Sequence, residues 1–179
     1  MAEGERLGLG ARLVIGGIAG FVATMAMTSA MRRLHRQLPA KERYPLTPRE
    51  IVDSALDRPP AAGELTLVAH FAYGAGCGAL IGAATVRPGR LGGAAAGGAV
   101  WLGSYMGWIP AMGILKPATQ HPLRRDLVML GAHFVWGWAT AEAMRELAEA
   151  RVTIFAAGPE PDRADGGRAA QSQSRKGQG

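Results

Sequence analysis

Four stretches of this chain contain no charged side chain, and they restrict its fold more than any other feature. They cover residues 13–31, 65–86, 91–115 and 127–141, and together they hold 81 of the 179 residues and none of the 34 charged side chains. A helix in lipid must exclude charge and satisfy its backbone internally, whereas the helices of a soluble bundle carry charged faces. The pattern therefore predicts an all-α, polytopic membrane protein.

The lengths of these stretches predict four transmembrane helices at about residues 13–31, 65–86, 91–109 and 127–147. At about 1.5 Å per residue, the first two are long enough to cross the hydrocarbon layer of a bilayer. In the third, Pro110 predicts a helix that ends or kinks near Ile109. The fourth has few uncharged residues, so we expect its helix to continue past Glu142, with that charge at the membrane interface or facing the bundle interior.

The polar segments predict the boundaries of the membrane domain. Residues 1–12 are expected to be a flexible N-terminus and residues 13–149 the membrane domain. Residues 150–179 are rich in Gly, Gln, Ser and Arg and poor in apolar side chains, a composition typical of disordered tails.

The segment between the first two spans contains a helix-start signature. Thr47 supplies a capping hydroxyl, Pro48 stands at the first helical position, and Glu50 follows three residues after the cap. The sequence therefore predicts a short helix over about residues 48–57. It either lies on the membrane surface, caps the bundle, or is an ordinary surface helix in a loop.

An internal repeat indicates a duplicated two-helix hairpin. The six residues 69–74, which contain His70, recur at residues 132–137, which contain His133, with four identities. Because each hairpin crosses the membrane twice, both copies would share one orientation. The first and third spans show a fainter echo of glycines, at Gly16, Gly17 and Gly20 and at Gly92, Gly93 and Gly97.

Small residues recur four apart along one ridge of each predicted helix. Such ridges let helix backbones approach closely in lipid, where the hydrophobic effect does not drive helices together. The sequence therefore predicts a compact four-helix bundle, and a spare ridge would allow a homo-oligomer. The glycines expected to pack helices are Gly16, Gly20, Gly74, Gly78, Gly82, Gly103, Gly107 and Gly137.

His70 and His133 are the first candidates for a functional role. They lie on the contact ridges at similar depth and are expected to face one another. The first hypothesis is that each imidazole forms a hydrogen bond across a helix interface, with Thr28, Tyr105 or a carbonyl as partner. The alternatives are a proton or ion pathway, and axial ligation of haem or a metal. Glu142 completes the set of candidate polar residues.

Several function classes have no support in the sequence. It contains no phosphate loop, no dinucleotide fingerprint and no catalytic triad pattern, so we expect no enzyme, no catalytic residue, no metal and no cofactor. The basic residues flank apolar segments rather than forming a stripe, so we expect no nucleic acid partner. The lone Cys77 allows no intramolecular disulfide. The expected partner is the lipid bilayer, and no small-molecule substrate is indicated.

The flanks of the first span bear on processing and orientation. A cleaved signal peptide is the alternative interpretation of residues 13–31, but Arg32 and Arg33 follow at once, as expected of a retained span. Lys and Arg near the spans are more numerous in the loops 32–64 and 116–125. The positive-inside rule then predicts these loops in the cytoplasm and both termini outside.

The chain resembles the small bacterial inner-membrane proteins of the YagU type. The resemblance lies in the glycine-rich opening at residues 17–27, the Pro-Leu-Thr-Pro-Arg-Glu segment at 45–50 and the His-Phe-Ala-Tyr-Gly segment at 70–74. It implies a multi-pass location in the plasma membrane and no established activity. The sequence as a whole predicts a non-enzymatic structural or accessory bundle. The alternatives are a small channel or transporter that uses His70 and His133, and a haem or metal redox protein.

Overall fold

A computed structural model of the chain describes residues 7–43, 47–57, 60–85 and 87–156. All regular secondary structure in these residues is helical, which confirms the expected all-α class. By its contacts the chain divides into two units, residues 1–149 and 150–179, and the fold below is that of the first unit. Most of the tail expected to be disordered, and the first residues of the expected flexible N-terminus, lie outside the described residues.

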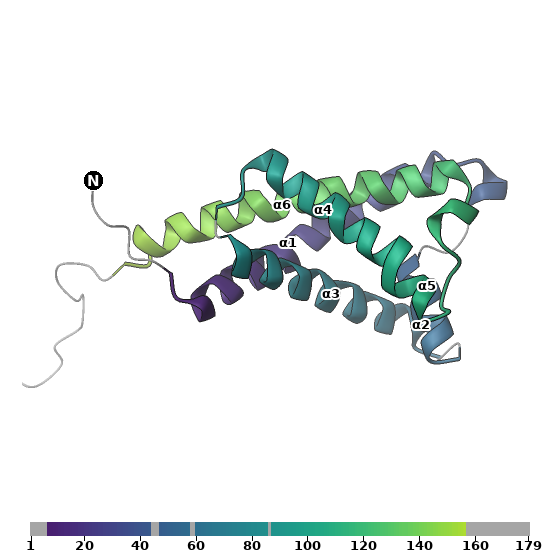
Figure 1. The fold of residues 1–179 in the computed structure, drawn as a ribbon, viewed down its shortest axis with the longest axis horizontal. Helices are drawn as coiled ribbons and strands as arrows, with labels where there is room; N and C mark the ends of the chain where they lie inside the picture. The colour runs from purple at the N-terminus through teal and green to yellow at the C-terminus, as the bar shows by residue number, and fades with distance from the viewer. Residues whose placement is uncertain (1–6, 44–46, 58–59, 86, 157–179) are drawn as a thin grey trace, which may run out of the picture. The chain divides into compact units, whose positions relative to one another are not determined.

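Four long helical segments make up the first unit (Figure 1). They are α1 (Leu9–Arg36), α3 (Ala62–Ala84), α4 (Arg90–Leu102) continued by η2 (Gly103–Trp108) and α5 (Ile109–Ala111), and α6 (Leu123–Val152). Shorter elements join them: η1 (Ala40–Glu42) and α2 (Thr47–Ala55) between α1 and α3, and η3 (Ala118–Gln120) before α6.

Two of these helices, α1 and α3, are long and apolar enough to cross a membrane. The third segment changes its helix type at Gly103, and α6 carries charges at both ends of its uncharged stretch. The helix α6 begins at Leu123, four residues before the predicted span, and thus includes Asp126 in its first turn.

Glycines bring α1 and α3 into backbone contact. The two helices run antiparallel, with Gly16 beside Gly82 and Gly20 beside Gly78. A Cβ added at Gly78 would lie 2.7 Å from the Cα of Gly20, and one added at Gly16 would lie 2.9 Å from the Cα of Gly82. No larger side chain fits between these backbones, so the glycine ridges predicted for the first two spans are confirmed.

A second glycine crossing joins α4 to α6. A Cβ at Gly137 would lie 2.8 Å from the backbone nitrogen of Gly97, and one at Gly93 would lie 2.5 Å from the carbonyl oxygen of Gly137. These helices also run antiparallel, because Gly93 meets Ala141 while Gly97 meets His133.

The two crossings are equivalent, as expected of a duplicated hairpin. Gly74 and Gly137, each four residues after the histidine of its repeat, occupy the same place in their crossings. Gly20 lies against Gly74 as Gly93 lies against Gly137. In the structure Gly20 therefore corresponds to Gly93. The alignment predicted from the glycine repeat, in which Gly20 corresponds to Gly97, is shifted by one helical turn.

The predicted packing role of Gly103 and Gly107 is wrong. A Cβ at either position would meet nothing within 4 Å, because α4 contacts α6 through Gly93 and Gly97 instead. Both residues belong to η2, a π-helical segment, in which Gly107 leaves helical geometry with φ −108° and ψ −108°. Pro110 accounts for this change, since it lacks an N–H and its ring crowds the carbonyl four residues earlier.

Replacing Gly103 tests this correction. We expect Gly103→Ala to leave the free energy of unfolding unchanged, or to raise it by up to about 1 kcal/mol, because alanine is the better helix former and the added methyl meets no neighbour. Unfolding in mixed detergent micelles would measure this. A loss of stability would restore Gly103 to a packing ridge.

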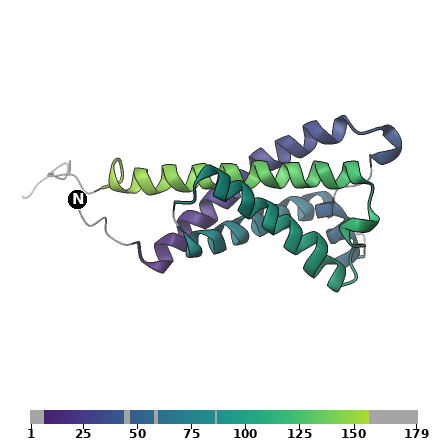
Figure 2. The ribbon, with the colours of Figure 1, turned by 45° about the horizontal axis from the view of Figure 1, so that its top comes forward.

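The two hairpins join through α1 with α6 and through α3 with η2 (Figure 2). The indole of Trp136 donates a hydrogen bond of 3.2 Å to the carbonyl of Gly20. Nearby, Met144 of α6 packs with Ile15 and Ala19 of α1. On the other side Tyr73 and Ser104 share a hydrogen bond of 2.8 Å. Each long segment thus contacts two others, and the four form a closed ring around a centre.

Candidate functional site

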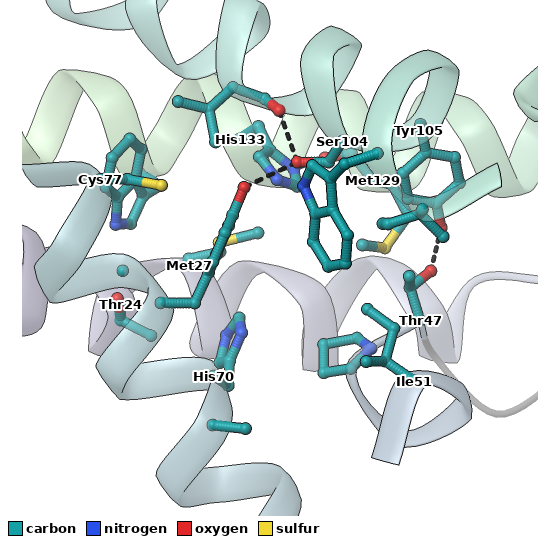
Figure 3. A pocket seen from close by; sticks show the side chains of 18 residues that line it. Thr24, Met27, Thr47, Ile51, His70, Cys77, Ser104, Tyr105, Met129 and His133 are labelled. Carbon is teal, nitrogen blue, oxygen red and sulfur yellow. Dashed lines mark hydrogen bonds between the residues drawn. The ribbon is translucent and has the colours of Figure 1, made fainter. Parts of the chain in front are cut away.

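The centre of the ring is a cavity of about 200 Å³. It lies where the helix pairs separate beyond their glycine crossings, on the side of the bundle where α2 packs. Its walls come from α1, α2, α3, α4, η2 and α6, as Figure 3 shows. Most of the lining is apolar, and Met27, Met129 and Trp136 contribute large parts of it. A concave, largely apolar space with a few polar groups is the usual form of a small-molecule site.

Both candidate histidines line this one cavity, from α3 and α6 (Figure 3). The Nδ1 of His133 lies 2.7 Å from the carbonyl oxygen of Met129, one turn earlier in the same helix. The predicted bond across a helix interface is therefore wrong for His133. The Nε2 of His70 is buried and has no hydrogen-bond partner among the described residues. This nitrogen therefore does not form the predicted hydrogen bond across a helix interface.

Two hydroxyl groups of the lining form a directed chain of hydrogen bonds. Ser104 Oγ lies 2.7 Å from the carbonyl of Val100, to which its single proton must go. The hydroxyl of Tyr73, 2.8 Å from Ser104 Oγ, is then the donor to Ser104. Thr24 likewise donates its hydroxyl proton to the carbonyl oxygen of Gly20, at 2.8 Å.

The short helix α2 closes one end of the cavity. Thr47 and Ile51 line the space, and Thr47 shares a hydrogen bond with the hydroxyl of Tyr105 in η2. Glu50 forms an ion pair with Arg125, whose side chain is only 7% exposed although it carries a full charge. Of the predicted alternatives for this helix, the cap on the bundle is the one that these contacts support.

The helix-start signature serves tertiary contacts rather than a capping box. The hydroxyl of Thr47 bonds to Tyr105 and the carboxylate of Glu50 bonds to Arg125. Beside this pair, burial raises the pKa of the Asp126 carboxyl, against the opposite effects of His121 and Arg125. Charged groups therefore gather where α6 begins, next to α2.

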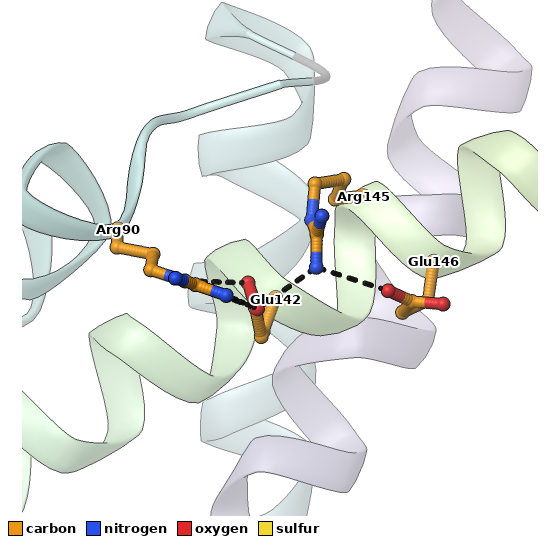
Figure 4. Close-up of polar contacts among 4 residues, drawn as sticks. All are labelled: Arg90, Glu142, Arg145 and Glu146. Carbon is orange, nitrogen blue, oxygen red and sulfur yellow. Dashed lines mark hydrogen bonds and ion pairs between the residues drawn. The ribbon is translucent and has the colours of Figure 1, made fainter.

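Glu142 lies apart from the cavity, in an ion-pair network on the outside of the bundle (Figure 4). Its carboxylate accepts hydrogen bonds from Arg90 at 2.7 Å and from Arg145 at 2.9 Å. Arg145 also contacts Glu146 at 3.0 Å. The partner Arg90 has a side chain that is 61% exposed. Glu142 therefore lies on the outer surface of the bundle and not in its interior.

Because this network is exposed, we expect Arg90→Gln to leave the midpoint of thermal unfolding in detergent unchanged within error. Solvent screens exposed ion pairs, and Glu142 keeps Arg145 as its partner. A clear fall in the midpoint would mean that the Arg90 contact is shielded from solvent and holds α4 to α6.

The cavity bears on the haem and metal alternative. An engineered cavity of about 150 Å³ holds one benzene ring, so a cavity of about 200 Å³ is too small for a porphyrin with its four pyrrole rings joined by methine bridges. Among the described residues, no three His, Cys, Asp or Glu side chains are grouped so that they could hold a metal ion. The two histidines and Cys77 do line the same space, with Cys77 as a free thiol.

The sequence pattern marks the two histidines but not the other residues that complete the site. Tyr73 belongs to the repeat and could have been singled out for its hydroxyl, and Arg125 carries the positive charge closest to the last uncharged stretch. Nothing in the sequence marks Ser104, whose burial depends on the π-helical turn. In comparisons with known protein families, curated proteins and solved structures, the chain matches none of them.

Proposed function

We propose that this protein is a four-span integral protein of the bacterial plasma membrane and acts as a non-enzymatic accessory bundle. One observation carries the proposal: all four helical segments expose large apolar side chains, and these lie within the stretches that lack charge. In water this much exposed apolar surface would drive aggregation, whereas in lipid it is the expected outer face. These side chains include Val14, Ile18 and Phe21 of α1, Leu67, Val68 and Leu80 of α3, Leu91, Leu102 and Met106 of the third segment, and Leu127, Phe134 and Trp138 of α6.

The polar groups inside the uncharged stretches support the same placement. Thr28, Thr66 and Thr140 each donate to the carbonyl one turn earlier in their own helix, at 2.5 to 2.8 Å. A hydroxyl bonded in this way does not need water. The contacts of α1 with both α3 and α6 also support its retention in the mature protein, against a cleaved signal peptide.

Labelling of single cysteines distinguishes four spans from two. In a Cys77→Ser background, Lys41→Cys, Arg87→Cys and Lys116→Cys are treated with a membrane-impermeant maleimide in intact cells and in inverted vesicles. With four spans, positions 41 and 116 react on one side and position 87 on the other. If only α1 and α3 cross, position 116 reacts together with position 87, and the four-span proposal fails. The side on which position 41 reacts tests the predicted orientation.

The accessory role is supported by how the cavity uses its polar groups. The protons of Thr24, Ser104 and Tyr73 are held in fixed hydrogen bonds, an arrangement suited to binding and positioning rather than to proton transfer. The resemblance to the YagU-type proteins supports the plasma-membrane location. A spare face for a homo-oligomer is part of the proposal, and cross-linking in native membranes would test it.

A small channel or transporter is the second candidate, because His70 and His133 line one cavity between four helices. On this hypothesis the imidazoles would relay protons or contact an ion. Proton flux into liposomes that contain the purified protein would test it. Flux that persists unchanged in the His70→Ala, His133→Ala double variant would argue against a histidine pathway, and flux that disappears would favour it.

A further inference from the structure

We infer that the central cavity is a binding site for a small, lipid-soluble aromatic molecule that carries a hydroxyl group, and that this molecule enters from the bilayer between α3 and η2. The inference rests on the proposed membrane placement for the route of entry, but not for the binding itself.

The size of the cavity sets the size of the ligand. A space of about 200 Å³ exceeds the engineered cavity of about 150 Å³ that takes benzene, so it has room for one ring with one or two small substituents. The walls suit an aromatic ring. Met27 and Met129 present thioethers, and Trp136 and Tyr105 present ring faces and edges.

The hydrogen bonds around the cavity select a ligand that donates a proton. The carbonyl of Met129 can only accept, so Nδ1 of His133 carries the proton and, in the neutral ring, Nε2 is left as an acceptor. The hydroxyl of Thr24 donates to the carbonyl of Gly20, and the hydroxyl of Tyr73 donates to Ser104. Both hydroxyl oxygens can still accept a hydrogen bond. These walls therefore present acceptors at His133, Thr24 and Tyr73, and an O–H group on the ligand would satisfy one of them.

His70 provides the second contact. Its Nε2 is buried beside the cavity without a partner among the described residues. A buried polar atom without a hydrogen bond is unfavourable, so a ligand that supplies one gains affinity there. A ring hydroxyl can donate or accept, so it can supply the hydrogen bond that His70 Nε2 lacks.

The exposed residues of the lining place the entrance. Ala69, Tyr73 and Trp108 line the cavity and are also exposed on the outside of the bundle. They belong to α3 and η2, so the opening lies between these two segments. In the four-span arrangement this opening faces lipid, where a small aromatic molecule concentrates by partitioning.

Protection of Cys77, which lines the cavity, measures binding directly. The purified protein in detergent is treated with a small thiol reagent while para-cresol, anisole or toluene is titrated. Para-cresol and anisole are isomers of equal size, but only para-cresol has a hydroxyl proton. We expect saturable protection by para-cresol at a concentration about tenfold lower than by anisole, the worth of one net hydrogen bond. Equal protection by the two isomers would overturn the hydroxyl assignment.

Variants at the entrance and at the histidine complete the test. Ala69→Phe should abolish protection, because the ring would fill the opening, whereas Ala72→Phe, on the same helix but outside the lining, should leave it intact. His133→Leu should bring para-cresol down to the affinity of anisole. An absence of saturable protection in the unsubstituted protein, or protection unaffected by Ala69→Phe, would overturn the site. The experiment is done in detergent, so its failure is separate from a failure of the four-span topology, which the labelling of positions 41, 87 and 116 decides.

Discussion

Gly78→Ala is expected to lower the free energy of unfolding of the bundle by about 2 to 3 kcal/mol, the upper part of the range for overpacked cores. The added Cβ would lie 2.7 Å from the Cα and 2.9 Å from the nitrogen of Gly20. Backbone atoms cannot rotate away as a side chain can, so α1 and α3 must separate along their whole crossing. Reversible unfolding in mixed micelles of a mild detergent and dodecyl sulfate would measure the change.

Gly76→Ala is the matched control, because it makes the same change two residues away on the same helix. A Cβ at Gly76 meets nothing within 4 Å, so the control should unfold like the original protein or slightly later. If both variants lose stability equally, the loss comes from the helix itself or from its lipid contacts, and the α1–α3 crossing described above is wrong.

Glu50→Gln is expected to cost about 2 kcal/mol of stability and to loosen α2 from the end of the cavity. The substitution removes the negative charge that Glu50 presents to the guanidinium of Arg125, whose side chain is 7% exposed. Removing one partner of a fully buried pair costs about 3 to 5 kcal/mol, and the figure is smaller here because Glu50 is 24% exposed. Unfolding measurements give the stability, and the rate of proteolysis within residues 47–57 reports on the attachment of α2.

Arg49→Gln provides the comparison for this variant. Arg49 pairs with Asp53 one turn along α2, at 2.8 Å, with 44% of its side chain exposed. An exposed pair of this kind contributes about 0.3 to 0.5 kcal/mol, so the control should change stability little. If Glu50→Gln behaves like Arg49→Gln, the pair with Arg125 is solvated and α2 is not held by it.

The helices and much of the packing could be predicted from the sequence because both follow from local composition. Absence of charge places the long segments, and the glycine pairs Gly16/Gly20 and Gly74/Gly78, each spaced four apart, mark faces that can meet another backbone. The repeat around His70 and His133 then relates the two hairpins. Each of these patterns extends over several turns of helix, so a wrong assignment at one residue does not change the predicted helix or its packing face.

The errors occur where a contact depends on another element. Gly103 lies on a plausible ridge, but it begins the π-helical segment η2, and a Cβ there would meet no neighbour. Thr47 and Glu50 match a local capping pattern, yet partners 58 and 75 residues away compete for the same atoms. The partner of His133 was expected across an interface, whereas a carbonyl in its own helix is nearer.

The position of the glycine crossings has a mechanical consequence. From Gly20 to the end of α1 at Arg36 the helix extends about 24 Å, at about 1.5 Å per residue. A pivot of about 10° at such a contact would displace the far end by about 4 Å, given that arm length. Glycines lack side chains that interlock, so they resist sliding less than they resist separation. A small rotation at the Gly20 crossing would therefore displace the end of α1 near Arg36 by several times the shift of residues next to the crossing.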